Sequence, residues 1–103
     1  MPYDVQTAPA VSDYLARLAA EEISPDALVS LVEQYTQELG ERADYFLEHY
    51  PVAHESYSFH YDTVLVDGNR LYEFTFIVDA GPAPFGVVVV VYVEHRLLGE
   101  RRE

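Results

Sequence analysis

The sequence predicts an α+β domain in which a helical hairpin packs on a small, mostly antiparallel sheet. Apolar residues recur at steps of three and four over residues 9–50, as on the buried face of amphipathic helices. Two alternating stretches then flank an Asp67-Gly68-Asn69 turn, which is a hairpin signal, and a run of five valines follows. The expected order is β-α-α-β-β-β, and a length of 103 residues predicts a single domain over residues 1–103.

The first elements are a short strand and a helix. Over residues 3–7, Tyr3, Val5 and Thr7 alternate with polar residues, which is the period-two pattern of a strand. Thr7 is expected to cap the following helix, with Pro9 in the first turn, where its missing N–H costs nothing. The apolar face of this helix is expected to hold Val11, Leu15, Leu18 and Ala19.

A longer helix follows. Ser24 is a good N-cap and Pro25 suits the first helical position. The helical pattern continues until Pro51, before which the helix is expected to end, and Gly40 is expected to loosen it. The other face of the helix is acidic and is expected to lie in solvent; it holds Glu33, Glu38, Glu41, Asp44 and Glu48.

The hairpin is expected to pair residues 56–66 with residues 70–79. With the turn centred on Gly68, odd-numbered residues of one strand pair with even-numbered residues of the other. One face is then expected to pack on the helices, and it holds Tyr57, Phe59, Tyr61, Tyr72, Phe74, Phe76 and Val78. The opposite face is expected to be polar, and it holds Ser58, His60, Asp62, Glu73, Thr75 and Ile77.

The C-terminal part begins with a Gly-Pro-Ala-Pro stretch, residues 81–84, at which the chain is expected to break. The last strand is expected over residues 85–95, and its continuous valine run predicts an interior strand that is buried on both faces. Residues 96–103 are expected to form a frayed tail. The alternative is an exposed Leu97-Leu98 pair that a partner or a second copy of the chain, in a homodimer, would cover.

The charge is strongly negative. Eighteen acidic residues face six arginines and no lysine, and the formal net charge is −12. Such a chain repels phosphate backbones and anionic membranes and attracts basic partners. The acidity keeps a small protein soluble, reflects an acid-rich proteome, or forms a surface that imitates nucleic acid and occupies a basic groove of another protein. The absence of cysteine excludes disulfides and thiolate metal sites.

The N-terminal residues show no secretory signal, because they contain neither a basic region nor an apolar run. The valine run is much shorter than the ~20 apolar residues that a membrane helix needs. A cytoplasmic protein without membrane contact is therefore expected.

Three segments, in the same order along the chain, resemble the RelE/ParE superfamily, the toxins of bacterial and archaeal toxin–antitoxin pairs. "YDVQTAPAVSDYLARL" is similar to the family's opening strand, Thr-Pro and helix. "DGNRLYEFTFIVD" resembles its strand after a Gly-containing turn, and "VVVVVYVEHR" resembles its terminal strand with a His-Arg pair. The resemblance implies a helical hairpin on a curved sheet and a cognate antitoxin protein as partner. RelE-like members cut messenger RNA, usually on the ribosome and without a metal, whereas ParE-like members bind DNA gyrase.

The resemblance also implies candidate site residues. Arg70 matches a sheet arginine directed at phosphate, and His95 and Arg96 match the terminal-strand acid and phosphate clamp of the ribonucleases. His60 falls where some members keep a histidine beside a carboxylate, here Asp62. The chain departs from the family in having no lysine and no tyrosine after the His-Arg pair. These departures put the ribonuclease activity in doubt, because affinity for a polyanion comes largely from cationic contacts.

Ordinary structural roles fit the same residues. His95 fits a half-exposed residue at a strand end that is bonded to a backbone carbonyl, and Arg70 and Arg96 fit surface ion pairs. His60, Asp62 and Glu73 could bind a metal, but no ligand spacing supports such a site, so no metal or cofactor is expected.

Three functions remain open at this point. The first is a metal-free ribonuclease of messenger RNA, which requires a local positive patch around Arg70 and Arg96. The second is a toxin-fold protein that binds gyrase or another protein with a basic groove. The third is an acidic, non-enzymatic inhibitor that imitates nucleic acid.

Overall fold

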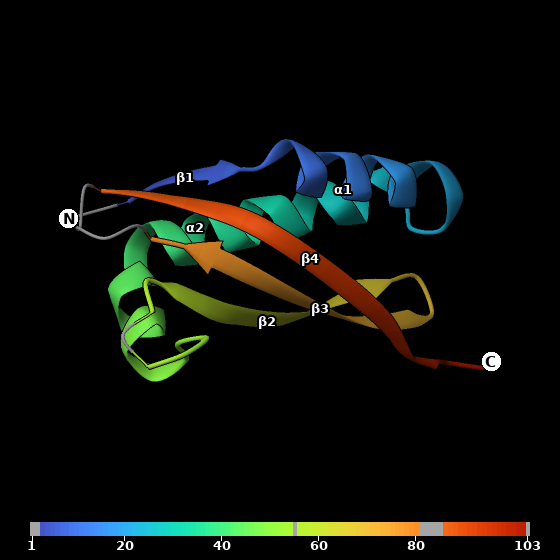
Figure 1. Ribbon diagram of the computed structural model, residues 1–103. Coiled ribbons are helices and arrows are strands. Elements are labelled where there is room, and N and C mark those ends of the chain that lie inside the picture. The colour runs from blue at the N-terminus through green and yellow to red at the C-terminus, as the bar shows by residue number, and fades with distance from the viewer. Residues whose placement is uncertain (1–2, 55, 81–85, 103) are drawn as a thin grey trace.

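The computed structural model describes residues 3–54, 56–80 and 86–102 and has two layers, a pair of helices and a four-stranded sheet (Figure 1). The order β-α-α-β-β-β and the α+β class are as predicted from the sequence. The elements are β1 (Asp4–Thr7), α1 (Pro9–Glu21), α2 (Pro25–His49), β2 (Ser58–Asp67), β3 (Arg70–Asp79) and β4 (Val87–Glu100).

The sheet has the strand order β1-β4-β3-β2. β1 runs parallel to β4, and the other neighbours are antiparallel. β2 and β3 form the predicted hairpin, whose pairing runs without interruption from Ser58 with Asp79 to Asp67 with Arg70. Gly68 in the turn has φ 59°, a left-handed conformation that glycine adopts without steric cost.

The core lies between the helices and one face of the sheet. Phe59, Tyr61, Tyr72, Phe74, Phe76 and Val78 are all buried there, which confirms the predicted aromatic face. They meet the apolar faces of both helices, including Leu15, Leu31 and Leu39. Tyr57 was expected on the same face, but its side chain is 49% exposed because it precedes β2 and lies outside the regular alternation.

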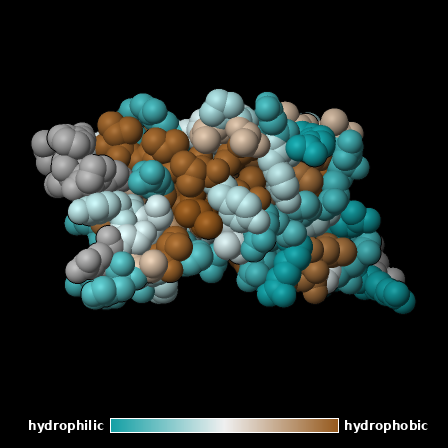
Figure 2. All heavy atoms as spheres, viewed as in Figure 1, coloured by the Kyte–Doolittle hydropathy of each residue, from teal (hydrophilic) through white to brown (hydrophobic). Residues whose placement is uncertain are grey.

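β4 is an interior strand, as predicted, but the prediction that it is buried on both faces is wrong. Val88 and Val90 face the helices and are fully buried, whereas Val87 and Val91 are exposed, because nothing in the described chain covers the other face of the sheet. We call this the open face. Figure 2 shows hydrophobic side chains gathered over β4 on this side, so the face is less polar than the sequence predicted.

A bulge in β4 changes the direction of its side chains. Ile77 pairs with Tyr92 and Val78 pairs with Val90, so Val91 is an extra residue between them. Before the bulge the even-numbered residues of β4 face the helices, and after it the odd-numbered residues do, beginning with Val93. The bulge therefore decides which residues at the end of β4 lie under the helices.

The helix ends confirm one predicted cap and correct another. Ser24 Oγ accepts a hydrogen bond from the Ala27 N–H, as expected of an N-cap. Thr7 does not cap α1: its hydroxyl bonds to Tyr35 Oη at 2.6 Å, and Ala8 takes the N-cap position without a side-chain bond. The Thr7 hydroxyl bonds to Tyr35 instead of to a backbone N–H of α1, because both side chains face the core.

Helix α2 ends before Pro51, as predicted, and is irregular near Gly40. Arg42 has φ −132° and ψ 23°, a non-helical conformation within the helix. The Gly40 carbonyl accepts a hydrogen bond of 2.6 Å from the Tyr3 N–H, and a Cβ on Gly40 would lie 3.4 Å from the Tyr3 carbonyl oxygen. The hydrogen bond holds the chain just before β1 against the helix backbone, and a Cβ on residue 40 would make only an ordinary van der Waals contact there.

The C-terminal residues are not a frayed tail. β4 continues through Leu97 and Leu98 to Glu100, which pairs with Arg70, and the Arg101 N–H donates to the Asn69 carbonyl at 2.6 Å. Leu97 and Leu98 are nevertheless exposed, as the alternative prediction required. The predicted break at residues 81–84 lies outside the described residues. Within the described ranges, neither helix is long and apolar enough to cross a membrane.

Candidate functional site

His95 lies on the helix-facing side of the sheet because the bulge in β4 turns it there. It pairs with Phe74 of β3, and its ring stacks on the Phe74 ring with centroids 5.5 Å apart. The Tyr72 ring lies 6.1 Å away on the other side of the imidazole along β3. Only 17% of the His95 side chain is exposed. The imidazole is therefore packed into the edge of the core rather than displayed at the end of a strand.

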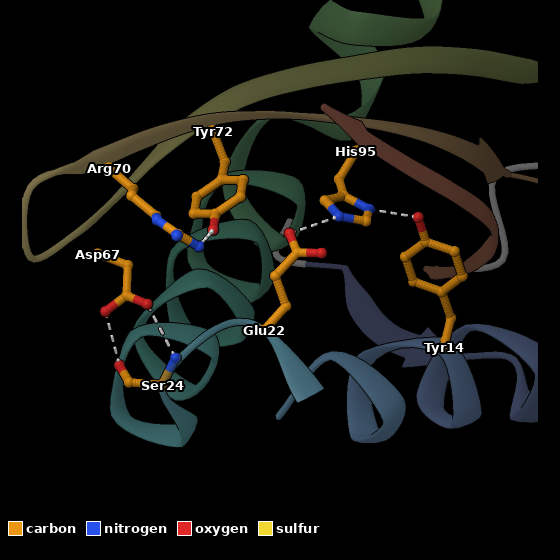
Figure 3. A network of polar contacts seen from close by, with 7 residues as sticks. All are labelled: Tyr14, Glu22, Ser24, Asp67, Arg70, Tyr72 and His95. Carbon is orange, nitrogen blue, oxygen red and sulfur yellow. Dashed lines mark hydrogen bonds and ion pairs between the residues drawn. The ribbon is translucent and has the colours of Figure 1, made fainter. Parts of the chain in front are cut away.

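Both nitrogens of His95 have partners from α1 and its C-terminal cap (Figure 3). Nδ1 lies 2.5 Å from Tyr14 Oη, and Nε2 lies 3.1 Å from Glu22 Oε2. A carboxylate only accepts hydrogen bonds, so Nε2 carries a proton and donates to Glu22. In the neutral imidazole, Nδ1 then accepts the Tyr14 O–H. His95 thus joins the middle and the C-terminal end of α1 to β4 and has no free nitrogen to offer a substrate.

Burial raises the pKa of the Tyr14 hydroxyl above its ordinary value, although the hydrogen bond to His95 acts in the opposite direction. Tyr14 therefore stays protonated at neutral pH and acts as a hydrogen-bond donor. Tyr14 and Glu22 were not among the residues that the sequence singled out. A signal was present for Tyr14, because it stands three residues after Val11 and so at the border of the apolar face of α1.

Arg70 lies on the same side of the sheet, at the start of β3, with Tyr72 between it and His95 (Figure 3). Its guanidinium donates to Tyr72 Oη at 3.4 Å and lies 3.6 Å from Glu100 Oε1. The hydrogen bond that Arg70 donates to Tyr72, followed by the charge of Glu100, raises the pKa of Arg70. Close by, Asp67 accepts two bonds from the backbone N–H and hydroxyl of Ser24, which fixes the hairpin end against the start of α2.

Arg96 and His60 lie on the open face instead. Arg96 Nε contacts Glu73 Oε1 at 2.9 Å, and 70% of the arginine side chain is exposed. His60 lies on β2, opposite Ile77, with β3 between it and β4. A shallow depression of about 340 Å³ beside Arg96 is lined by Glu73, Thr75, Glu94, Arg96 and the adjoining residue His95, whose two imidazole nitrogens contact Tyr14 and Glu22 on the helix-facing side. Its charged lining contains more carboxylates than cations, which is unfavourable for a phosphate.

The four predicted catalytic residues are therefore not gathered in one site. His95 and Arg70 face the helices, whereas Arg96 and His60 are on the opposite side of the sheet. The sequence predicted that β4 would end at His95. Because the strand continues to Glu100, the adjacent residues His95 and Arg96 both belong to it and point to opposite faces of the sheet. The predicted positive patch around Arg70 and Arg96 is absent from the described residues, since each arginine is paired with a glutamate on its own face.

A metal site is not supported either. Within the described ranges, no three histidine and carboxylate side chains are arranged to hold a metal ion. His60 pairs with Ile77, Asp62 with Thr75 and Glu73 with Val64, so these three side chains are spread along the hairpin. Comparison with models of protein families, with curated proteins and with solved structures found no match. The function must therefore be inferred from the residues and the geometry described above.

Proposed function

We propose that this chain is a toxin-type protein that resembles the RelE/ParE superfamily and acts by binding a protein target rather than by cutting RNA. One observation carries this choice: His95 and Arg96 lie on opposite faces of the sheet. Ribonuclease chemistry needs an acid and a cation within hydrogen-bonding reach of one phosphate. Two groups on opposite faces of one strand do not converge on one phosphate without remodelling of the strand.

Charge supports the same choice. The net charge is −12, and both arginines of the candidate site already contact carboxylates. Binding RNA depends on cations that neutralise phosphates, so an RNA ligand would have to separate these pairs and approach an acidic surface. A basic protein surface is attracted instead, and complementary charge accelerates the encounter.

The open face supplies a surface for such a contact. It displays apolar side chains, among them Val64, Val66, Leu71 and Tyr92, beside the carboxylates of Glu73 and Glu94. Contiguous exposed apolar residues rimmed by polar groups are typical of protein interaction sites. DNA gyrase or another protein with a basic groove fits this surface, and a cognate antitoxin would be the partner that neutralises the chain.

Controlled expression in a bacterial host tests the proposal. We expect growth arrest with intact messenger RNA, and we expect arrest to persist in Arg70→Gln, whose side chain lies away from the open face. Leu71→Glu, the next residue in β3 but on the open face, should relieve arrest. The purified Leu71→Glu variant must show the circular dichroism of the wild type. Messenger cleavage that is lost in His95→Gln would overturn the proposal in favour of a ribonuclease.

The second candidate is an acidic inhibitor without toxin activity. One observation favours it: Glu33, Glu41, Asp44 and Glu48 are all exposed along α2, so one helix carries a row of carboxylates. Absence of growth arrest, together with binding of the purified chain to a nucleic-acid-binding protein in competition with DNA, would favour this function over the toxin role.

A further inference from the structure

We propose that the free edge of β2, from Asp62 to Val66, binds an extended segment of a basic partner protein in which apolar and cationic residues alternate. This inference deepens the proposed protein-binding function and identifies the class of partner. β2 is the outermost strand of the sheet. An outermost strand presents backbone N–H and C=O groups to which another strand can add.

Two hydrogen bonds show which backbone groups point outward. The Val52 N–H donates to the Ser58 carbonyl, and the His60 N–H donates to the Tyr50 carbonyl, both at 2.9 Å. This short segment before β2 therefore covers only the beginning of the strand. Because the direction of the backbone alternates along a strand, the outward groups that follow belong to Asp62, Val64 and Val66. Among the described residues, no backbone or side-chain group pairs with them.

The edge has few of the features by which proteins prevent strand addition. Its ten pairs with β3 are regular, without a bulge, and the strand contains neither proline nor lysine. Val64 is 53% exposed and Val66 is 66% exposed, and both project onto the open face. A strand added here would place every second side chain beside these valines, where an apolar residue gains the most from burial.

The intervening side chains of an added strand would lie on the other side of the sheet, beside α2. There Glu38 Oε2 accepts the Tyr61 hydroxyl at 2.6 Å, so its carboxylate is held next to β2. Over its whole length helix α2 carries six carboxylates and one arginine, so an added strand would lie beside an acidic helix. A second copy of the chain would bring another acidic helix to the same place, whereas lysine or arginine in the added strand complements it.

A seven-residue peptide of alternating lysine and valine, with both termini capped, tests the inference with the intact protein. We expect binding that weakens as salt is raised. Bound peptide should slow amide hydrogen exchange at Asp62, Val64 and Val66, whose amides have no backbone partner in the described part of the chain. Two control peptides should each bind at least about tenfold more weakly. One has the same composition but carries its lysines and valines in two separate runs, and the other alternates glutamate with valine.

Two variants locate the contact. Val64→Pro removes one outward N–H without removing a bond to β3 and should weaken peptide binding about tenfold, while Val64→Ala keeps the N–H and should have a smaller effect. Glu38→Gln retains an acceptor for Tyr61 and should weaken binding roughly threefold, whereas Glu33→Gln, on the side of α2 that faces α1, should not. The Gln variants keep the test decisive if Val64→Pro does not fold.

Other results would overturn the inference. The contact would lie elsewhere if the peptide with lysines and valines in separate runs bound as tightly as the alternating peptide. Exchange protection away from β2 would lead to the same conclusion. Protection of the same amides in the protein alone, rising with its concentration, would identify a second copy as the occupant. These results concern the edge only: growth arrest relieved by Leu71→Glu would still support binding through the open face.

Discussion

The Tyr14 hydroxyl lies 2.5 Å from His95 Nδ1, although the two residues are 81 positions apart in the sequence. The contact joins the middle of α1 to the second half of β4, beyond the point where β1 ends its pairing with that strand. Glu22 holds the other imidazole nitrogen from the C-terminal end of the same helix. His95 thus fixes α1 on the sheet beyond Val90, where none of the described strands pairs with that edge of β4.

We predict that His95→Ala destabilises the fold more than Tyr14→Phe does. Tyr14→Phe removes one hydrogen bond, which is worth about 0.5–1.5 kcal/mol of unfolding free energy. His95→Ala removes two hydrogen bonds and the ring contact with Phe74. Urea unfolding at pH 7 measures both. Tyr92→Phe is the control, because its bond to Glu94 lies in solvent on the open face and should contribute little. A His95→Ala variant as stable as the wild type would contradict the structural role.

Phe76→Ala should lose about 3–5 kcal/mol of unfolding free energy, because it leaves a large cavity in a close-packed core. The Phe76 side chain is fully buried, and its ring lies 5.2 Å from that of Tyr35 and 6.1 Å from that of Tyr61. Val66→Ala, on the exposed side of the hairpin, should change stability by less than about 0.5 kcal/mol. Chemical denaturation of the two variants checks the facing of the hairpin, since a one-residue change of register would reverse their order.

The pair of Arg96 and Glu73 should contribute less than about 1 kcal/mol to stability, because an exposed ion pair is well screened. A double-mutant cycle with Arg96→Gln and Glu73→Gln measures the coupling, and added salt should reduce it. A large coupling energy would show that the pair is held rigidly, in disagreement with its exposure.

Alkaline pH should destabilise the protein from about pH 10 upward, which is the ordinary pKa of tyrosine. Burial raises the pKa of Tyr61, and the Glu38 carboxylate raises it further. Burial also raises the pKa of Tyr35. Because the folded state holds these protons more tightly than the unfolded state, the stabilisation is complete below pH 10 and is lost as the pH rises toward the raised values.

The Tyr61→Phe variant tests this assignment. It should lose about 0.5–1.5 kcal/mol at pH 8 with the bond to Glu38, and its stability should then fall less steeply than that of the wild type above pH 10. Urea unfolding at pH 8 and at pH 11 provides the comparison. Tyr57→Phe, an exposed position outside β2, should keep the steep decline of the wild type. Equal slopes for Tyr61→Phe and the wild type would refute the role of Tyr61.

Local signals predicted most of the architecture. Gly68 in the hairpin turn set the pairing of β2 with β3, since two-residue turns strongly limit the register. The alternation of aromatic and polar residues then determined which face is buried, as Phe74 and Phe76 confirm. Ser24 and Pro25 marked the start of α2 because capping depends on a few neighbouring residues. Each of these features is encoded within a short stretch of chain.

The candidate site could not be predicted in the same way. The sequence predicted that β4 would end at His95. Only the pairing of the residues after His95 with the start of β3 shows that Arg96 belongs to the strand and lies on the face opposite to His95. Nor could the sequence reveal that Tyr14 and Glu22 would meet the imidazole, because such contacts depend on where α1 lies on the sheet.

By itself, the sequence determined the order of the elements, the hairpin register and the aromatic face of the sheet. Only the tertiary structure decided which way His95 points, through the bulge at Val91. The physical reason lies in the run from Val87 to Val91: its side chains are identical, so hydrophobic alternation cannot mark an extra residue there. The position of the bulge depends on pairing with strands that are distant in the sequence.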